Sequence, residues 1–175
     1  MALYQCGLTQ SVALAGAALF EAQAHRLARL ARRAVLVLDG DEAGLHGARQ
    51  ALPLLLERGI YPEIVVLQEG RDVADIACEK GRRGVVHLLR RRQSFTSFVL
   101  RQDQAAGRLE DAFDYAEAIR ELLTLIRLFP DAQRRSGMLL RAFTESKQLV
   151  PRFAFQSATG EAHRFRAWCA TMARL

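Results

Sequence analysis

Two short apolar runs separated by a helix-length segment constrain the fold of this chain more than any other feature. Residues 34–38 (AVLVL) and 63–67 (EIVVL) have the length and composition of strands that are buried on both faces of a sheet. Residues 42–58 lie between them, carry apolar residues at helical spacing and are followed by Gly59, a typical helix stop. A strand, a helix and a second strand in this order predict a βαβ unit on a parallel sheet.

The flanking segments extend this pattern on both sides. Toward the N-terminus we expect a helix tail at 1–6 capped by Gly7, a strand at 9–15, a turn at 16–18 and an amphipathic helix at 19–33. From about residue 74 the periodicity is wholly helical, with segments at 75–101, 110–129 and 131–149. The predicted fold class is therefore α/β, a parallel sheet with flanking helices, followed by an all-α part.

Composition excludes several classes of protein. The 175 residues fit one compact domain, or one domain with a small satellite. Three cysteines without a C-x-x-C pair argue against a disulfide framework or a zinc site and favour a reducing, cytoplasmic location. No apolar run approaches the ~18 residues of a membrane span, and the apolar N-terminal stretch lacks the positive charge of a signal peptide. The formal net charge of +6 favours anionic partners such as nucleic acid or nucleotides.

Three acidic residues follow the two central strands. Asp39 and Asp41 come directly after the first strand, and Asp72 lies in the loop that leaves the second. Ligands of open parallel sheets bind beyond the carboxyl ends of the strands, so these carboxylates are expected at one edge. Donors that are all oxygen suit Mg²⁺ or Mn²⁺, ions that serve phosphoryl and nucleotidyl transfer. The alternative is that Asp41 is only the N-cap of the next helix.

Two further patterns surround these acids. Small residues at helical spacing after Asp41 would let the next helix lie close to the sheet; they are Gly44, Gly47, Ala48 and Ala51. Six arginines follow the acidic loop, namely Arg82, Arg83, Arg90, Arg91, Arg92 and Arg101. They predict either a basic surface for a template strand or a triphosphate, or simply a solvated helix end.

The two acid-bearing segments resemble a known family when they are taken in order. VLVLDGDEAGLHGARQAL (35–52), followed by LQEGRDVADIACEKG (67–81), is similar to the TOPRIM domain of bacterial replicative, DnaG-type DNA primases. The resemblance divides the chain into a TOPRIM domain at 1–101 that lacks its first strand, a helical subdomain at 107–149 and an unassigned helical tail at 150–175.

The resemblance also implies roles for individual residues. Asp39 and Asp41 match the paired metal-binding aspartates, and Asp72 matches the first aspartate of the family's third motif. Arg71 stands where the family has a basic residue, and Arg82 and Arg83 would join it in binding nucleotide or DNA. The implied cofactor is Mg²⁺ or Mn²⁺. The implied substrates are single-stranded DNA and ribonucleoside triphosphates, the implied activity is primer synthesis, and a replicative helicase is a candidate partner.

This sequence departs from the family at positions that matter for metal binding and catalysis. The second aspartate of the third motif falls on Ala74, with Asp75 one position later. The family's catalytic glutamate belongs to a strand that would precede residue 1. No catalytic residue is therefore assigned within these 175, and we expect the chain to be inactive by itself.

Other classes of protein also carry such an acidic motif. The alternatives are a non-catalytic TOPRIM remnant that binds metal, nucleic acid or a partner, and the TOPRIM domain of a topoisomerase or nuclease. A haloacid-dehalogenase-type phosphatase also places D-x-D after a strand, but its motif continues into Gly-Thr rather than the Glu-Ala-Gly found here.

Overall fold

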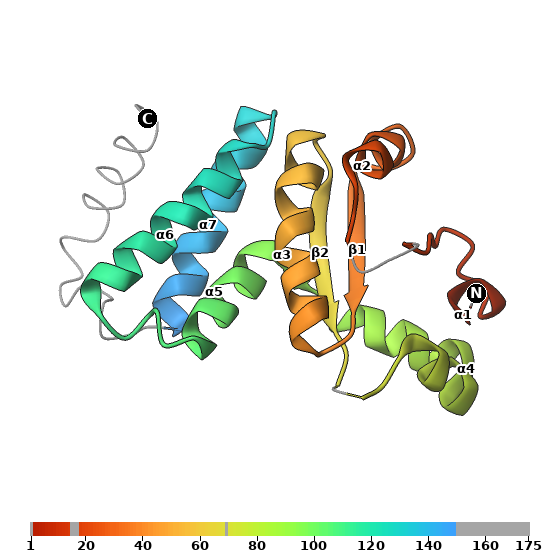
Figure 1. The fold of residues 1–175 in the computed structure, drawn as a ribbon. Helices are drawn as coiled ribbons and strands as arrows, with labels where there is room; N and C mark the ends of the chain where they lie inside the picture. The colour runs from red at the N-terminus through yellow and green to blue at the C-terminus, as the bar shows by residue number, and fades with distance from the viewer. Residues whose placement is uncertain (1, 15–17, 69, 150–175) are drawn as a thin grey trace.

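The computed structural model describes residues 2–14, 18–68 and 70–149, and the predicted tail at 150–175 lies outside them. The elements in chain order are α1 (Ala2–Gln5), α2 (Glu21–Ala28), β1 (Arg33–Leu38), α3 (Glu42–Glu57), β2 (Tyr61–Val66), α4 (Val73–Arg90), β3 (Gln93–Ser94), α5 (Phe95–Ala105), α6 (Ala112–Arg127) and α7 (Ala132–Leu149). The α/β elements and the helices α5 to α7 form neighbouring parts of the molecule (Figure 1). None of the described helices has the length and apolar character that a membrane crossing needs.

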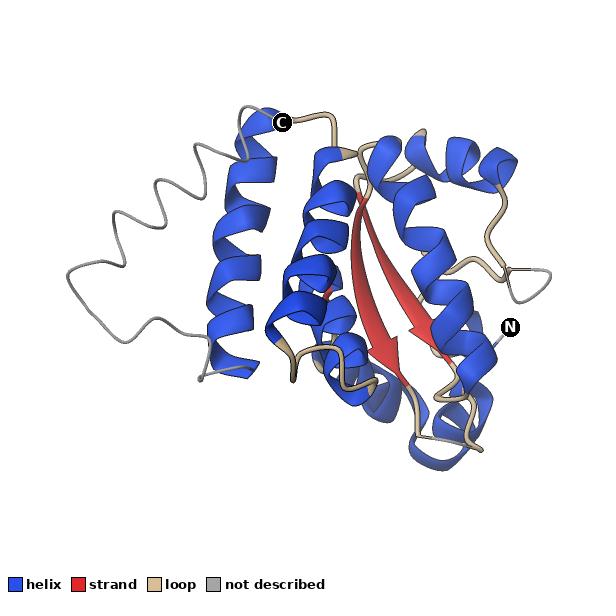
Figure 2. Ribbon diagram, turned by 60° about the vertical axis from the view of Figure 1, so that its left-hand side comes forward, coloured by secondary structure: helices blue, strands red, loops and turns tan. Residues whose placement is uncertain are grey.

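The sheet contains the predicted βαβ unit. β1 and β2 pair in parallel, from Arg33 opposite Tyr61 to Leu38 opposite Val66, and α3 connects them. Figure 2 shows these two strands side by side, pointing in the same direction, with helices on either side of them. The two-residue strand β3 pairs antiparallel with β2, so the sheet order is β1-β2-β3 and the sheet is mixed rather than purely parallel.

Helix α3 is central because it packs in two directions. Its small residues Gly47, Ala48 and Ala51 are buried, which confirms the predicted close packing of this helix. On one side Leu55 packs with α2, and on the other Leu52 packs with β2 and the helices α5 to α7. The core thus runs without a break from the α/β elements into the helical part.

Three predicted elements are wrong in their extent or existence. The described residues 9–14 contain no strand: they have no pairing partner there, and Val12 is 69% exposed. Helix α2 is shorter than the predicted 19–33: it begins at Glu21 and ends at Ala28, with Arg29 as its C-cap, and Arg33 is already the first residue of β1. The predicted helix at 75–101 is interrupted by β3, whose residues pair with β2 instead of continuing the helix.

Candidate functional site

The turn between β1 and α3 holds the first two predicted site residues. Asp41 is the N-cap of α3, and its Oδ1 accepts a hydrogen bond of 2.7 Å from the backbone N–H of Gly44. A Cβ added to Gly44 would lie 2.5 Å from the carbonyl oxygen of Asp39. Only glycine therefore lets the first turn of α3 approach the end of β1 this closely, which gives the D-G-D-x-A-G pattern a structural basis.

The third predicted acid occupies the same kind of position after β2. Asp72 is the N-cap of α4 and accepts a hydrogen bond of 2.8 Å from the backbone N–H of Asp75. The Asp75 carboxylate accepts one of 3.0 Å from the backbone N–H of Asp72, so the two residues form a reciprocal capping box. Because β1 and β2 are parallel neighbours, Asp39, Asp41 and Asp72 all follow strands at the same edge of the sheet.

These donors fit a hard cation in kind but are not gathered into a cage. All three carboxylates are exposed and supply the oxygen ligands that Mg²⁺ and Mn²⁺ prefer. Across residues 2–14, 18–68 and 70–149, however, no group of three or more histidine, cysteine, aspartate or glutamate side chains is close enough to hold a metal ion. Each cap occupies one oxygen of a two-oxygen carboxylate, so capping and cation binding are compatible at Asp41 and Asp72.

The three predicted basic site residues have different surroundings. Arg71 forms an ion pair of 2.5 Å with Glu79, and this hydrogen-bonded pairing raises the pKa of Arg71 and lowers that of Glu79. Arg82 donates a hydrogen bond of 2.8 Å to the carbonyl oxygen of Cys6 and so ties α4 to α1. Arg83 is exposed and lines a cleft beside α4.

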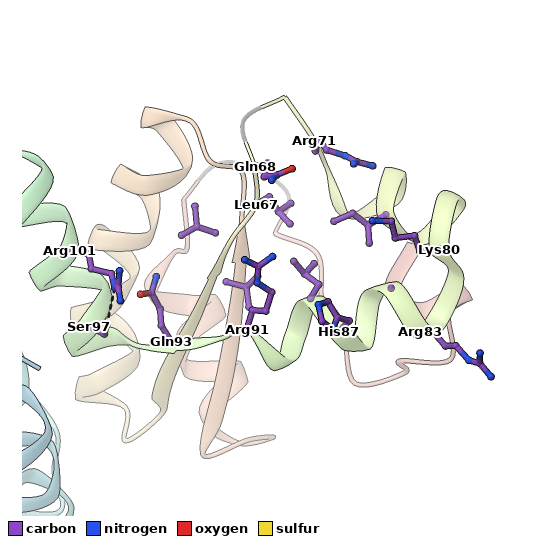
Figure 3. A pocket seen from close by; sticks show the side chains of 15 residues that line it. Leu67, Gln68, Arg71, Lys80, Arg83, His87, Arg91, Gln93, Ser97 and Arg101 are labelled. Atoms are coloured by element: carbon purple, nitrogen blue, oxygen red, sulfur yellow. Dashed lines mark hydrogen bonds between the residues drawn. The ribbon is translucent and has the colours of Figure 1, made fainter. Parts of the chain in front are cut away.

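That cleft has a volume of about 900 Å³ and lies beside the end of β2 (Figure 3). Its walls come from the end of β2, from α4, from β3 and from the start of α5. Five cationic side chains line it: Arg71, Lys80, Arg83, Arg91 and Arg101. We call this the α4 cleft.

Sequence reasoning missed part of this lining. Lys80 and His87 were not singled out, although both line the α4 cleft. A signal was available, because Lys80, Arg83, His87 and Arg91 recur at intervals of three and four residues, the spacing of one helix face. The kink at Gly81, with φ of +56°, falls inside this series and is not visible in the spacing.

The comparisons with known proteins agree with this arrangement. Residues 1–77 match the Toprim-like family. The DNA primase of Lactococcus lactis is 31% identical over 127 residues, which cover 70% of this chain and 20% of the relative. The DNA primase of Aquifex aeolicus is 33% identical over 87 residues, which cover 50% and 18% of the two chains.

A solved structure shows the same fold. The DnaG primase catalytic domain bound to single-stranded DNA superposes with a TM-score of 0.71 at 21% identity, covering 83% of this chain and 47% of that one. The present chain thus spans about a fifth of the curated relatives and just under half of this solved domain. Residues 1–77 are thus Toprim-like, the sequence is similar to part of bacterial DNA primases, and the fold resembles part of the DnaG catalytic core.

Proposed function

We propose that this chain supplies the acid-bearing part of a primase-type core and that Asp39, Asp41 and Asp72 bind Mg²⁺ or Mn²⁺ there. The observation that carries the proposal is the position of the three acids after the ends of two strands paired in parallel. When bound, the ion would neutralise charge on phosphate oxygens during nucleotidyl transfer.

The chain's own residues would prepare this edge for phosphates. The N-termini of α3 and α4 begin beside the acids, and the positive end of a helix dipole favours an anion. Arg71 precedes Asp72, and its guanidinium is held by Glu79 rather than swinging freely. Arg71 would contact nucleotide or DNA phosphates. Arg83 would do so as well, together with those N–H groups of Arg82 that do not bind the Cys6 carbonyl.

The proposed substrates are single-stranded DNA as template and ribonucleoside triphosphates. Support comes from the relatives, which are DNA primases, and from the solved relative that is bound to single-stranded DNA. The replicative helicase stays a predicted partner that rests on the resemblance alone.

Metal binding is tested by titrating Mn²⁺ into the wild-type chain and into two matched variants. Asp41→Asn removes a charge but keeps a good N-cap, so it separates the two roles of Asp41. Asp111→Asn does the same at the N-cap of α6 and serves as the control. We expect Asp41→Asn to weaken Mn²⁺ binding about tenfold, because cation affinity follows the number of charged ligands, and Asp111→Asn to leave it unchanged. Equal affinity in all three proteins would leave Asp41 a helix cap and nothing more.

Catalysis is tested by primer synthesis on a single-stranded template with ribonucleotides and Mg²⁺. We expect no primers from the 175-residue chain, which spans a fifth of its primase relatives. Fused behind the part of the Lactococcus lactis primase that precedes the matched segment, it should make primers that Asp39→Ala abolishes. An inactive fusion would favour the non-catalytic alternative, and primers from the chain alone would contradict our expectation.

A further inference from the structure

The described lining of the α4 cleft contains cationic side chains but no carboxylates. Among the fifteen described residues that line it, five are lysine or arginine and none is aspartate or glutamate. The uncharged lining includes apolar side chains and four that can form hydrogen bonds, namely Gln68, His87, Gln93 and Ser97. A cleft of this composition has a positive potential that only an anionic ligand can neutralise.

Some arginines of the described chain are held in ion pairs, whereas others, including Arg26 and Arg29 outside the cleft, are not. Outside the cleft, Arg33, Arg49, Arg58, Arg92, Arg108, Arg120 and Arg134 all pair with carboxylates. Within the described residues, Lys80, Arg83 and Arg91 form no such pair, and Arg101 contacts the Ser97 hydroxyl at 3.4 Å. The cleft therefore keeps Lys80, Arg83, Arg91 and Arg101 available to an external ligand, whereas Arg71 is already paired with Glu79.

The cations form a row rather than a single point. Figure 3 shows Arg101 at one side of the cleft, Lys80 and Arg71 at the other, and Arg91 with His87 between them. One phosphate could contact only part of such a row, whereas the successive phosphates of a nucleic-acid strand could contact all of it. No phenylalanine, tyrosine or tryptophan is among the described residues that line the cleft, so stacking on large aromatic rings would not hold the bases.

We propose that the α4 cleft binds the phosphodiester backbone of a single nucleic-acid strand through Lys80, Arg91 and Arg101. The choice of nucleic acid rests on the proposed function, but the binding itself does not need the carboxylates or a metal ion. Because the contacts are to phosphates, binding is independent of base sequence and falls steeply with salt. A free nucleoside triphosphate carries the same phosphate chemistry and is the competing ligand.

The test measures fluorescence anisotropy of a labelled oligothymidylate, with EDTA present so that the metal site cannot contribute. The cleft variant is Arg91→Gln/Arg101→Gln. The matched control is Arg26→Gln/Arg29→Gln in the last turn and at the C-cap of α2, which lies at the opposite end of the strands from α4 (Figure 1). Each double variant lowers the formal net charge from +6 to +4, so the two differ only in where charge is removed.

We expect the cleft variant to bind the oligonucleotide at least tenfold more weakly. Its slope of log affinity against log salt should fall by about 1.4, the value for two lost single-strand phosphate contacts. The control should keep the wild-type slope. Equal losses in both variants would assign binding to net charge and overturn the proposal, as would unchanged binding in the cleft variant.

Further measurements test a third lining cation, a competing ligand and the metal site. Lys80→Gln removes a third, exposed lining cation and should weaken binding by itself, which covers the case that the double variant fails to fold. Displacement of the oligonucleotide by ATP at concentrations far below those of matched salt would make a nucleotide the ligand and overturn the assignment to a strand. Mn²⁺ binding measured on the cleft variant should be intact, so failure of this proposal is distinguishable from failure of the metal site.

Discussion

Asp103 of α5 is a buried anion at the contact between α3 and the helical part. Its side chain is 2% exposed, and Oδ1 accepts hydrogen bonds from Arg49 of α3 at 3.1 Å and from Arg108 at 3.0 Å. Both guanidinium groups also contact Glu121 of α6, whose side chain is 52% exposed. The four residues therefore join three helices, with one anion inside the contact and one at its rim.

Removing the Asp103 carboxylate should lower the free energy of unfolding more than removing the Glu121 carboxylate. A hydrogen bond to a charged group contributes about 1.5–3 kcal/mol net, so removing two at Asp103 would cost at least about 3 kcal/mol. Removing Oδ2, which is buried without a hydrogen-bond partner among the described residues, offsets part of this. We therefore expect Asp103→Ala to lower the free energy of unfolding by about 2–3 kcal/mol, a loss of roughly 4–12 °C in Tm. Glu121→Ala should cost about 1 kcal/mol or less because its pairs are screened by solvent.

Urea unfolding followed by circular dichroism at pH 7 measures both losses. Asp103→Asn is the third variant: it keeps an acceptor oxygen for the two arginines but removes the charge, and should lie between wild type and Asp103→Ala. A cost for Glu121→Ala equal to or larger than that for Asp103→Ala would refute the reasoning, because burial would then not decide the strength of these bonds.

Three other predictions concern single residues. Gly44→Ala places a Cβ 2.5 Å from the carbonyl oxygen of Asp39 and should destabilise the chain by about 1–3 kcal/mol in urea unfolding; a loss below about 0.5 kcal/mol would contradict the close approach. Gly81→Ala meets no atom within 4 Å, so its cost, about 1–2 kcal/mol by the same assay, is that of a positive φ alone, and a stabilised protein would contradict it. The hydrogen bond from Arg108 lowers the pKa of Glu121 below its ordinary value of 4.5. Between the folded pKa and 4.5 the unfolded state therefore binds more protons than the folded state does. The stability that Glu121 adds is fully present above pH 4.5 and is lost as the pH falls toward the lower folded pKa. The stability difference between wild type and Glu121→Gln should shrink between pH 7 and pH 3.5, and a constant difference would exclude this linkage.

The central strands and α3 could be predicted because their signals are local. An apolar run, a capping aspartate and a stop at Gly59 each act within a few residues of the element they define. The predicted strand at 9–15 failed because a strand needs a partner edge, which is not a local property. In the described part of that segment Leu14 packs on the cluster formed by α2 and α3, while Val12 stays exposed. The break between α4 and α5 was missed for a related reason: pairing of residues 93–94 with β2 overrides a helical periodicity that continues through them.

The position of the candidate site was predictable, but only part of its hydrogen bonding was. The edge on which Asp39, Asp41 and Asp72 lie follows from the order of strands and helices alone. The pairing of Asp72 with Asp75 is a spacing of three residues and could have been anticipated as a capping box. The contact of Arg82 with the carbonyl of Cys6 spans 76 residues and could not.

The acids and the α4 cleft are adjacent, and this links the two proposals. Asp72 begins α4 and Arg71 lines the cleft, so the cationic row ends one residue from an acid of the candidate metal site. Arg71 is the lining cation that directly precedes Asp72, and its ion pair with Glu79 already neutralises its charge within the described chain. Lys80, Arg91 and Arg101 form no ion pair in the described chain, so the phosphates of a bound strand would not compete with carboxylates for these three cations. If it extended past Arg71, its next phosphate would lie beside Asp72, where only a cation between phosphate and carboxylate could offset their repulsion.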